Sequence, residues 1–365
     1  MDEFLTWRVC IVHFMTVSMK DIARELGVSV VTVSKALRNH PDLSKTTRER
    51  ILLKMKEMRY RPNLTARSLV TGRSSLIGLI VPDLIHPFFA EIARGLSRAL
   101  REHGYFIVMA SSEEDPELEQ QEIEHMLAHR LGALVVASCQ TGSEFLQRTQ
   151  LEGTPLILVD RSFKDLNSHF VGSDDYSVGK LAAEHLLGAG CKRIAHIRGP
   201  ENSVGRRRLK GFADVLKTHG MEMAQDHIVQ VPRGDVDGRS NGADALQRLK
   251  TLPRLPDGLF CYNDVIAVGV INEALSQGIE VPKQLAVIGC GNLHYDTEIR
   301  VPLSSIDQRS DEIGSRTASL ILDILAEEVP GKCRQIILQP KLMARNSTAR
   351  KPPQRISKPV SRTRG

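Results

Sequence analysis

The alternation of short apolar runs with amphipathic segments constrains the fold of this chain more than any other feature. From Ser75 onward, runs such as LIGLIVP, YFIVMAS, ALVVAS and PLILVD are separated by segments such as PFFAEIARGLSRALREHG and SVGKLAAEHLLGAG. Short runs that are apolar throughout, between such helices, favour parallel sheets covered by helices on both faces. About 270 residues of this pattern exceed one usual core, so we expect two α/β lobes.

Charge is distributed unevenly along the chain. The formal net charge is +6, but residues 19–73 contain 13 Lys or Arg and 5 Asp or Glu, which gives +8. Residues 345–365 contribute +7 and residues 1–18 contribute −1, so residues 74–344 are near −8. A basic head on an acidic body indicates a nucleic-acid-binding module joined to a domain of another kind.

The head has the pattern of a helix-turn-helix. MKDIAREL is a short amphipathic helix that Gly27 ends, and Ser29 can cap a second helix that runs to about Leu37. Ser44 can cap a third helix that runs through about Met58. A helix, a tight turn containing glycine and a second short helix fit the helix-turn-helix motif.

The second of these helices combines two kinds of face. Val33 and Leu37 are among the residues that can pack inward, whereas Val31 falls on another face, with Lys35 one turn later. The spacing leaves Val30 ambiguous, because it lies three residues before Val33. An exposed valine beside a lysine on a well-capped helix is a feature that internal packing does not explain.

Several functional classes find no support in the sequence. No apolar run reaches membrane-spanning length, and Arg8 and His13 interrupt the apolar start FLTWRVCIVHFMTV, which no small-residue cleavage site follows. We therefore expect residues 1–17 to be a disordered extension. The six cysteines are scattered, and there is no P-loop, GxGxxG or evident nucleophile–base pair. We expect no catalytic residue, no metal site and no cofactor.

Eight sequence words resemble the lactose-repressor family of bacterial transcription regulators. They are MKDIARELGVSVVTVSKAL, TRERILLKMKEMRYRPN, ARSL, IGLIVPDLIHPFFAEI, VDR, RLKGF, NDVIAVG and PLSSIDQ. They occur in the order and at the spacing of the family, across about residues 18–348, and together they are highly specific. The resemblance implies an α/β fold: an N-terminal helix-turn-helix head and a two-lobed body, like periplasmic binding proteins, of doubly wound parallel sheets.

The same resemblance implies a division into domains. The helix-turn-helix domain would occupy 18–61, a hinge helix and linker 62–73, and an effector-binding and dimerisation domain 74–348. Its N-lobe would comprise about 74–173 plus 306–330, and its C-lobe about 174–305 plus 331–348. The basic tail, 349–365, is expected to be disordered. It lacks the leucine heptads of a tetramerising coil, so we expect a homodimer.

In that family the second helix of the head enters the DNA major groove. The resemblance places Val30, Val31 and Lys35 at base-reading positions, where valine suits a thymine methyl and lysine can donate to guanine O6 and N7. The alternative is that both valines simply pack. Expected phosphate contacts are Ser29, Thr32, Ser34, Arg38, Ser44 and Thr47, each of which could instead be an ordinary cap or surface residue.

PNLTARSL resembles the hinge helix of the family. In dimers of that family the paired hinges enter the minor groove at the centre of the operator, and a leucine wedges between base pairs and kinks the duplex. The matching positions are Asn63, Ala66 and Leu69. Packing of Leu69 against the body is the competing interpretation.

The body of the family binds an effector between its lobes, at the carboxyl ends of the strands. The matching residues are Phe88, Phe89, Asp160, Asp174, Asn202, Arg208, Asn263, Asp264, Gly291, Asn292 and Gln308. For each of them, a structural role as a helix cap or core residue is the competing interpretation. One departure is that Gly291 occupies a position where the family often has an aspartate, for which the neighbouring Asn292 is a partial substitute. Without that carboxylate, Arg208 favours a ligand with an acidic end, such as a sugar acid.

The combined expectation is a transcription regulator of the repressor type in the cytoplasm. It would bind a palindromic double-stranded operator, respond to a small effector such as a sugar or sugar acid, and have no enzymatic activity and no membrane partner. Two alternatives share the body: a secreted solute receptor and an enzyme on a doubly wound fold. The basic head counts against the first, and the missing catalytic constellation counts against the second.

Overall fold

The computed structural model describes residues 17–37, 39–61, 74–231, 233–234, 236–327 and 331–350. The chain divides into two compact units, 1–73 and 74–365. Four predicted features fall outside the described residues: nearly all of the N-terminal extension, Arg38, the hinge segment 62–73 and most of the basic tail.

The described residues of the head form three short helices. They are α1 (Met19–Leu26), α2 (Val30–Leu37) and α3 (Lys45–Glu57), as the sequence predicts. Ser18 and Asp21 form a capping box at the start of α1, and Gly27 ends it with a left-handed φ of 64°. Ser29 Oγ accepts from the N–H of Thr32 at 3.1 Å at the start of α2. Side-chain caps therefore define where these helices begin.

The core of the head is small. Ile22, Val33, Ala36, Ile51 and Met55 are buried in it. Leu37 is 38% exposed, so the expectation that it packs inward is wrong. Within α2, only Val33 and Ala36 are buried against the core. Leu37 is the last residue of the helix and lies at the edge of this contact.

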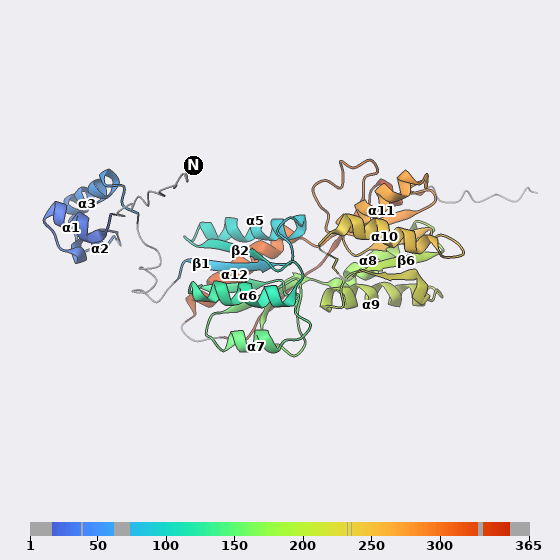
Figure 1. Ribbon diagram of the computed structural model, residues 1–365, viewed down its shortest axis with the longest axis horizontal. Helices are drawn as coiled ribbons and strands as arrows, with labels where there is room; N and C mark the ends of the chain where they lie inside the picture. The colour runs from blue at the N-terminus through green and yellow to red at the C-terminus, as the bar shows by residue number, and fades with distance from the viewer. Residues whose placement is uncertain are drawn as a thin grey trace, which may run out of the picture. The chain divides into compact units, whose positions relative to one another are not determined.

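The first lobe of the body is a parallel sheet with helices on both faces (Figure 1). Its strand order is β11-β5-β4-β3-β1-β2, and the bounds are β1 (Leu76–Val81), β2 (Phe106–Ser111), β3 (Ala133–Val136), β4 (Leu156–Val159), β5 (His169–Ser173) and β11 (Gln335–Leu338). Helices α5 (Pro87–Arg101) and α12 (Ser310–Ala326) pack on one face. Helices α6 (Pro116–Ala128) and α7 (Glu144–Gln150) pack on the other.

The second lobe repeats this architecture. Its strand order is β12-β10-β9-β8-β6-β7, and the bounds are β6 (Ile194–Arg198), β7 (Ile228–Gln230), β8 (Gly258–Cys261), β9 (Ala286–Cys290), β10 (Ser304–Asp307) and β12 (Lys341–Met343). Helices α10 (Gly238–Lys250) and α11 (Asp264–Ser276) cover one face, and α8 (Asp175–Gly188) and α9 (Ser203–Thr218) the other. Two short 3₁₀ helices, Gln225–His227 and Asn346–Thr348, complete it.

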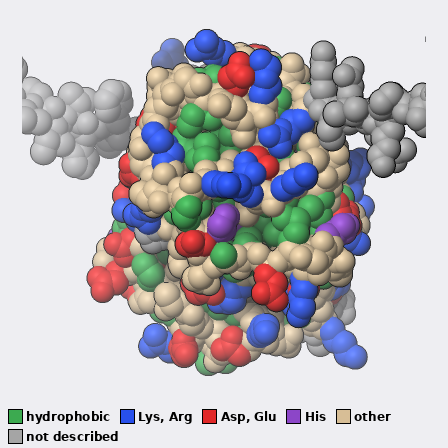
Figure 2. All heavy atoms as spheres, turned by 90° about the vertical axis from the view of Figure 1, so that its right-hand side faces the viewer, with side chains coloured by type: hydrophobic (Ala, Val, Ile, Leu, Met, Phe, Trp, Pro, Cys, Tyr) green, Lys and Arg blue, Asp and Glu red, His purple; other side chains and the backbone are tan. Residues whose placement is uncertain are grey.

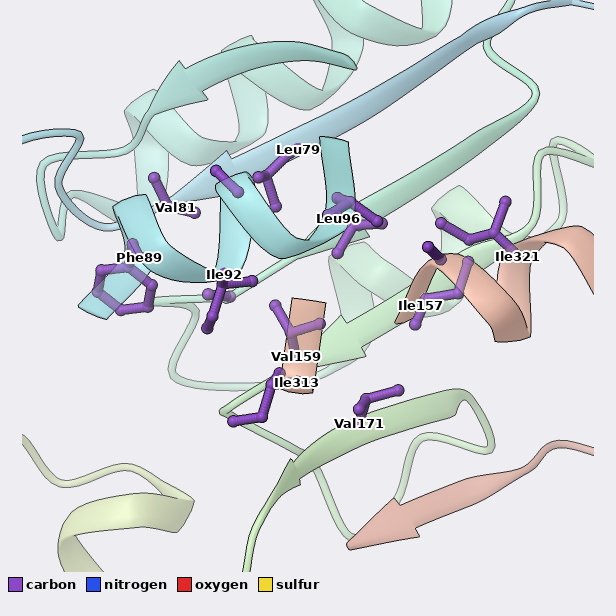
Figure 3. Packing of buried hydrophobic residues seen from close by; sticks show 14 of the residues in the cluster. Leu79, Val81, Phe89, Ile92, Leu96, Ile157, Val159, Val171, Ile313 and Ile321 are labelled. Atoms are coloured by element: carbon purple, nitrogen blue, oxygen red, sulfur yellow. The ribbon is translucent and has the colours of Figure 1, made fainter. Parts of the chain in front are cut away.

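The apolar runs of the sequence are strands because both faces of each sheet are buried. In β1, Leu79 packs under α5 and α12, whereas its neighbour Ile80 packs on the side of α6 and α7. Figure 3 shows the first of these layers, with Leu79 and Ile157 of the sheet near Leu96 of α5 and Ile321 of α12. The prediction of helix-covered parallel sheets is confirmed.

The assignment of the C-terminal segments to lobes needs correction. β10 ends at Asp307 and belongs to the second lobe, so the first lobe resumes after it rather than at residue 306. β11 pairs with β5 of the first lobe, although the sequence-based division placed 331–348 wholly in the second. β12 and the 3₁₀ helix Asn346–Thr348 return to the second lobe, where β12 pairs antiparallel with β10. A four-residue edge strand carries too little pattern to reveal its partner.

Figure 2 shows the end of the body that the second lobe forms. Lys and Arg side chains and Asp and Glu side chains both occur on this face, and hydrophobic side chains lie between them. Neither sign of charge occupies the face alone.

None of the described helices combines the length and the apolarity of a membrane span.

Candidate functional site

The start of α2 presents apolar side chains to solvent. Val31 is 62% exposed and Val30 is 37% exposed, whereas Val33 is fully buried. The ambiguity that spacing left for Val30 is therefore resolved toward exposure. Lys35 lies one turn beyond Val31, and its Nζ donates to Oδ2 of Asp42 at 3.2 Å. Two valines and a lysine thus form an exposed surface on the second helix of the head.

Hydroxyl groups cluster at two helix starts in the head. Ser29 Oγ lies 2.8 Å from Thr32 Oγ1 at the start of α2, and Ser44 Oγ lies 2.8 Å from Thr47 Oγ1 at the start of α3. Helix N-termini and hydroxyls are suited to phosphate oxygens. Ser34 is half-buried on α2. The remaining predicted DNA contacts, Arg38, Asn63, Ala66 and Leu69, lie outside the described residues.

The body contains a cavity at the carboxyl ends of strands from both lobes. Asp160 follows β4 of the first lobe, Asn263 follows β8 of the second, and Gln308 follows β10. The cavity is lined by His86, Phe88, Phe89, Asp160, Arg208, Tyr262, Asn263, Cys290 and Gln308. Parallel α/β sheets bind ligands at this edge. Six of the residues expected at an effector site are thereby brought together.

Arg208 is held inside the cavity wall by an ion pair. It is 3% exposed, its Nε donates to Oδ1 of Asp175 at 2.9 Å, and its Nη1 donates to the carbonyl of Tyr262 at 2.6 Å. Its guanidinium also lies 4.9 Å from the centre of the Tyr262 ring. Burial raises the pKa of Asp175, while Arg208 acts in the opposite direction. The charge of Arg208 already has a partner, which removes the argument for an acidic ligand.

Two further cavity residues, Asp160 and Asn263, have unusual constraints. Asp160 has a strained backbone, and Asn263 contacts the other lobe. Asp160 has a left-handed φ of 62°, a conformation that non-glycine residues adopt mainly where the surroundings enforce it. Asn263 caps α11 through its Oδ1, and its Nδ2 donates to the carbonyl of Gly234 at 2.8 Å. That Nδ2 also lies 3.3 Å from Nε2 of His86 in the first lobe. The side chain of Asn263 is therefore fixed by the fold.

Gln308 offers a hydrogen-bond donor to the cavity. Its Oε1 accepts from the thiol of Cys290 at 3.3 Å, and its Nε2 is buried with no hydrogen-bond partner among the described residues. An unpaired buried amide N–H costs free energy, which a ligand with an acceptor would offset. Burial raises the pKa of Cys290 well above its ordinary value, so this thiol stays protonated.

Five residues expected at the effector site do not line this cavity: Asp174, Asn202, Asp264, Gly291 and Asn292. Asp174 and Asn202 cap α8 and α9. Asp264 is fully buried and accepts from the hydroxyl of Ser305. Asn292 accepts from the guanidinium of Arg345 through its Oδ1, so it does not replace the missing carboxylate.

The backbone explains the glycine at position 291. Gly291 has a φ of 140°, and a Cβ there would lie 2.9 Å from Oδ2 of Asp264. A side chain at this position would be strained and would crowd a buried carboxylate. The departure from the family pattern is therefore built into the local fold.

Sequence reasoning missed three residues of the cavity wall. His86, Tyr262 and Cys290 lie at or next to strand or helix ends whose neighbours were predicted. Tyr262 precedes the predicted Asn263, and Cys290 precedes the predicted Gly291. Their position at the carboxyl ends of strands was the available signal.

The cavity is nearly closed. Its volume is about 10 Å³, and a cavity of about 100 Å³ that also includes Asp160 lies on the side of Arg207 and Gln335. Drug-sized ligand pockets are typically larger, at about 300 Å³ or more. The N–H of Ser162 donates across the lobes to Ser203 Oγ at 2.9 Å, and Arg233 donates to the carbonyl of Glu113. These contacts tie the two lobes together beside the small cavity. A hollow of about 810 Å³, which His86 also lines, lies between other residues of the two lobes, among them Ile85 and Val265.

Comparison with known proteins agrees with both parts of this architecture. Residues 18–63 match the family model of bacterial regulatory proteins, lacI family. Residues 74–345 match the model of periplasmic binding proteins and the sugar binding domain of the LacI family. The chain belongs to the LacI family. It is therefore a DNA-binding transcription regulator with an effector-binding domain, and not an enzyme.

Individual LacI-family relatives resemble it along most of its length. The HTH-type transcriptional repressor CytR of Escherichia coli K12 is 30% identical over 91% of this chain and 96% of its own. The ribose operon repressor of the same strain is 30% identical over 90% of this chain and 99% of its own. The crystal structure of the lac repressor dimer bound to operator and the anti-inducer ONPF has a TM-score of 0.77 at 23% identity, covering 91% and 99% of the two chains.

Proposed function

We propose that this LacI-family regulator is a repressor that binds a palindromic operator as a homodimer and is controlled by a small molecule bound between its lobes. The observation that carries the proposal is the exposed Val31 and Lys35 surface on a capped second helix, in a chain whose body holds a cavity between two lobes. An operator-binding protein acts where the chromosome is, so we place it in the cytoplasm.

The operator is read by α2 in the major groove. Val30 and Val31 contact thymine methyl groups, and Lys35 donates to guanine. The hydroxyls of Ser29, Thr32, Ser34, Ser44 and Thr47, together with Arg38, bind phosphates and set the register. Asn63, Ala66 and Leu69 enter the minor groove, where Leu69 unstacks a base step.

Two features support a homodimer. A palindromic site requires two heads related by a two-fold axis. β2, an edge strand of the first lobe, exposes Phe106 by 53% and Val108 by 42%, and Ile85 is 87% exposed in the loop before α5. Exposed apolar edge strands are typical of surfaces that another chain covers.

Binding of DNA is tested by its salt dependence. The full chain should bind a duplex selected from a random library, and log K should fall linearly with log salt concentration, by about 0.9 for each phosphate contact. A solute receptor or an enzyme on the same body fold would show no salt-dependent binding to DNA or heparin.

Lys35→Ala should weaken operator binding by about 1–3 kcal/mol for each half-site, because each head loses one donor to a guanine edge. The base preference at one position of each half-site should relax, and the other positions should keep theirs. Selection of operators from a random library by the wild type and the variant measures both effects. An unchanged preference in the variant would show that Lys35 does not read a base.

The effector is a small, uncharged molecule rich in hydroxyl or carbonyl oxygens, such as a sugar. Gln308 offers a donor and Asp160 an acceptor, while Asp175 neutralises Arg208. A thermal-shift screen of sugars, sugar acids and nucleosides tests this. At a ligand concentration of 100 times Kd, binding stabilises the folded state by about 2.7 kcal/mol. A response confined to sugar acids would contradict the assignment of an uncharged ligand.

A further inference from the structure

The carboxylate of Asp42 holds the ammonium group of Lys35. Nζ of Lys35 donates to Oδ2 of Asp42 at 3.2 Å, and Nδ1 of His40 lies 3.3 Å from the same oxygen. The side chains of Lys35 and Asp42 are 37% and 62% exposed. Because Lys35 lies one turn after Val31 on α2, this ion pair is on the helix face that carries the exposed valine.

The backbone keeps Asp42 at this place. The N–H of His40 donates to the carbonyl of Lys35 at 3.1 Å, and the N–H of Leu43 donates to the carbonyl of His40 at 3.2 Å. Asn39 turns the chain with a left-handed φ of 54°. Leu43 packs against the core of the head. The turn that carries Asp42 is thus tied to the end of α2 on one side and to the core on the other.

We propose that Asp42 is a specificity-determining residue of the head, because it positions the Lys35 ammonium for a base edge and keeps it from the phosphates. This inference rests on the proposed reading of DNA by α2. Lysine is a point charge on a flexible stem, and phosphate contacts supply most of the affinity for unrelated DNA. A carboxylate beside the ammonium restrains the stem and repels the phosphate backbone.

The substitution Asp42→Asn in the full chain tests the proposal. Asparagine keeps the size of the side chain and removes its charge. The affinity for a scrambled duplex should rise, and the salt slope on that duplex should steepen by about 1.8 for the dimer, because each of its two Lys35 side chains gains a phosphate at about 0.9 per contact. The ratio of affinities for the selected and scrambled duplexes should fall about tenfold for each half-site, because each head loses its base contact.

Two further variants distinguish this role from a general effect of charge. Glu57→Gln makes the same charge change at another acid that pairs with a lysine, since Lys54 Nζ lies 2.7 Å from Glu57 Oε2 on α3. It should leave the ratio of affinities unchanged. In a Lys35→Ala background, Asp42→Asn should no longer steepen the slope.

Three results would overturn the role of Asp42. They are an equal loss of selectivity in Glu57→Gln, an equal effect of Asp42→Asn without Lys35, and a selectivity that Asp42→Asn does not change. Each of these leaves DNA binding by the wild type intact. If the wild type itself prefers no sequence, the proposed function fails, and the inference fails with it.

Discussion

Replacing Arg208 by alanine should lower the free energy of unfolding of the body by about 3–5 kcal/mol, the range for removal of one partner of a buried ion pair. Asp175 is 4% exposed and would remain without the guanidinium that now lies 2.9 Å from its Oδ1. The carbonyl of Tyr262 would lose its 2.6 Å donor as well. Urea unfolding of the full chain, followed by the transition of the body, measures the loss.

Arg207→Ala is the matched control. Arg207 is the adjacent residue on α9, its side chain is 54% exposed, and it pairs with Asp174 at 3.1 Å. An exposed pair of this kind contributes about 1 kcal/mol or less. A double variant, Arg208→Met with Asp175→Asn, should recover most of the stability, because no charge is left buried. Equal losses in the two single arginine variants would contradict the role assigned to the buried pair.

A third variant at this position, Arg208→Lys, separates the loss of charge from the loss of the planar guanidinium. Arg208→Lys keeps a positive charge, but a single ammonium cannot reproduce the planar fork that reaches both Asp175 and Tyr262. We expect this variant to be intermediate in stability. Operator binding without effector should survive in each variant that folds, because the head has its own core of Ile22, Val33 and Ile51.

The parts of the fold that follow local rules could be predicted from the sequence. The caps Ser29 and Ser44 and the left-handed Gly27 fix the helices of the head over a few residues. The apolar runs that became β1 and β9 are buried on both faces, so their composition alone indicates strands. β11 and β12 were not assigned because edge strands of three or four residues depend on distant partners.

The sequence could predict the site residues that lie at the carboxyl ends of strands, but not the contacts that their side chains make. Strand ends place Asp160, Asn263 and Gln308 together, because parallel strands end at one edge. The partners of the charged groups were not predictable. Asp175 reaches Arg208 from 33 residues away, and Arg345 reaches Asn292 from 53 residues away. Such contacts depend on the packing of whole helices and loops, and they changed the expected ligand from an acid to an uncharged molecule.

Two aspartates, Asp264 and Asp296, are buried together in the second lobe. Both side chains are fully buried, and neither carboxyl oxygen of Asp296 has a hydrogen-bond donor among the described residues. The two carboxyl groups interact unfavourably when both are ionised, so one of them keeps a proton. Nη1 of Arg345 lies 3.8 Å from Oδ2 of Asp296, and Tyr295 is adjacent. Burial and the neighbouring Asp264 raise the pKa of Asp296 far above its ordinary value. The folded protein therefore retains a proton that the unfolded chain releases at neutral pH.

Asp296→Asn should stabilise the body at pH 8 by about 2 kcal/mol, and the gain should shrink as the pH is lowered toward the unfolded pKa of about 4. A carboxyl group whose folded pKa is raised contributes full stability below its unfolded pKa and loses it as the pH rises toward the folded value. Asparagine supplies a permanent N–H donor to Asp264 and has no proton to lose. Urea unfolding midpoints of wild type and variant at pH 5, 6.5 and 8 measure the trend.

Asp257→Asn is the control for this last experiment. Asp257 is another buried aspartate of the second lobe, but its Oδ1 accepts from the N–H groups of Lys192 and Arg193, and its Oδ2 lies 3.4 Å from Nη2 of Arg193. Removing that negative charge should destabilise the lobe, because charge-assisted acceptors are lost. Opposite signs are therefore expected for two similar substitutions. A loss of stability in Asp296→Asn at pH 8, or a gain that does not change with pH, would show that the carboxyl pair does not hold a proton.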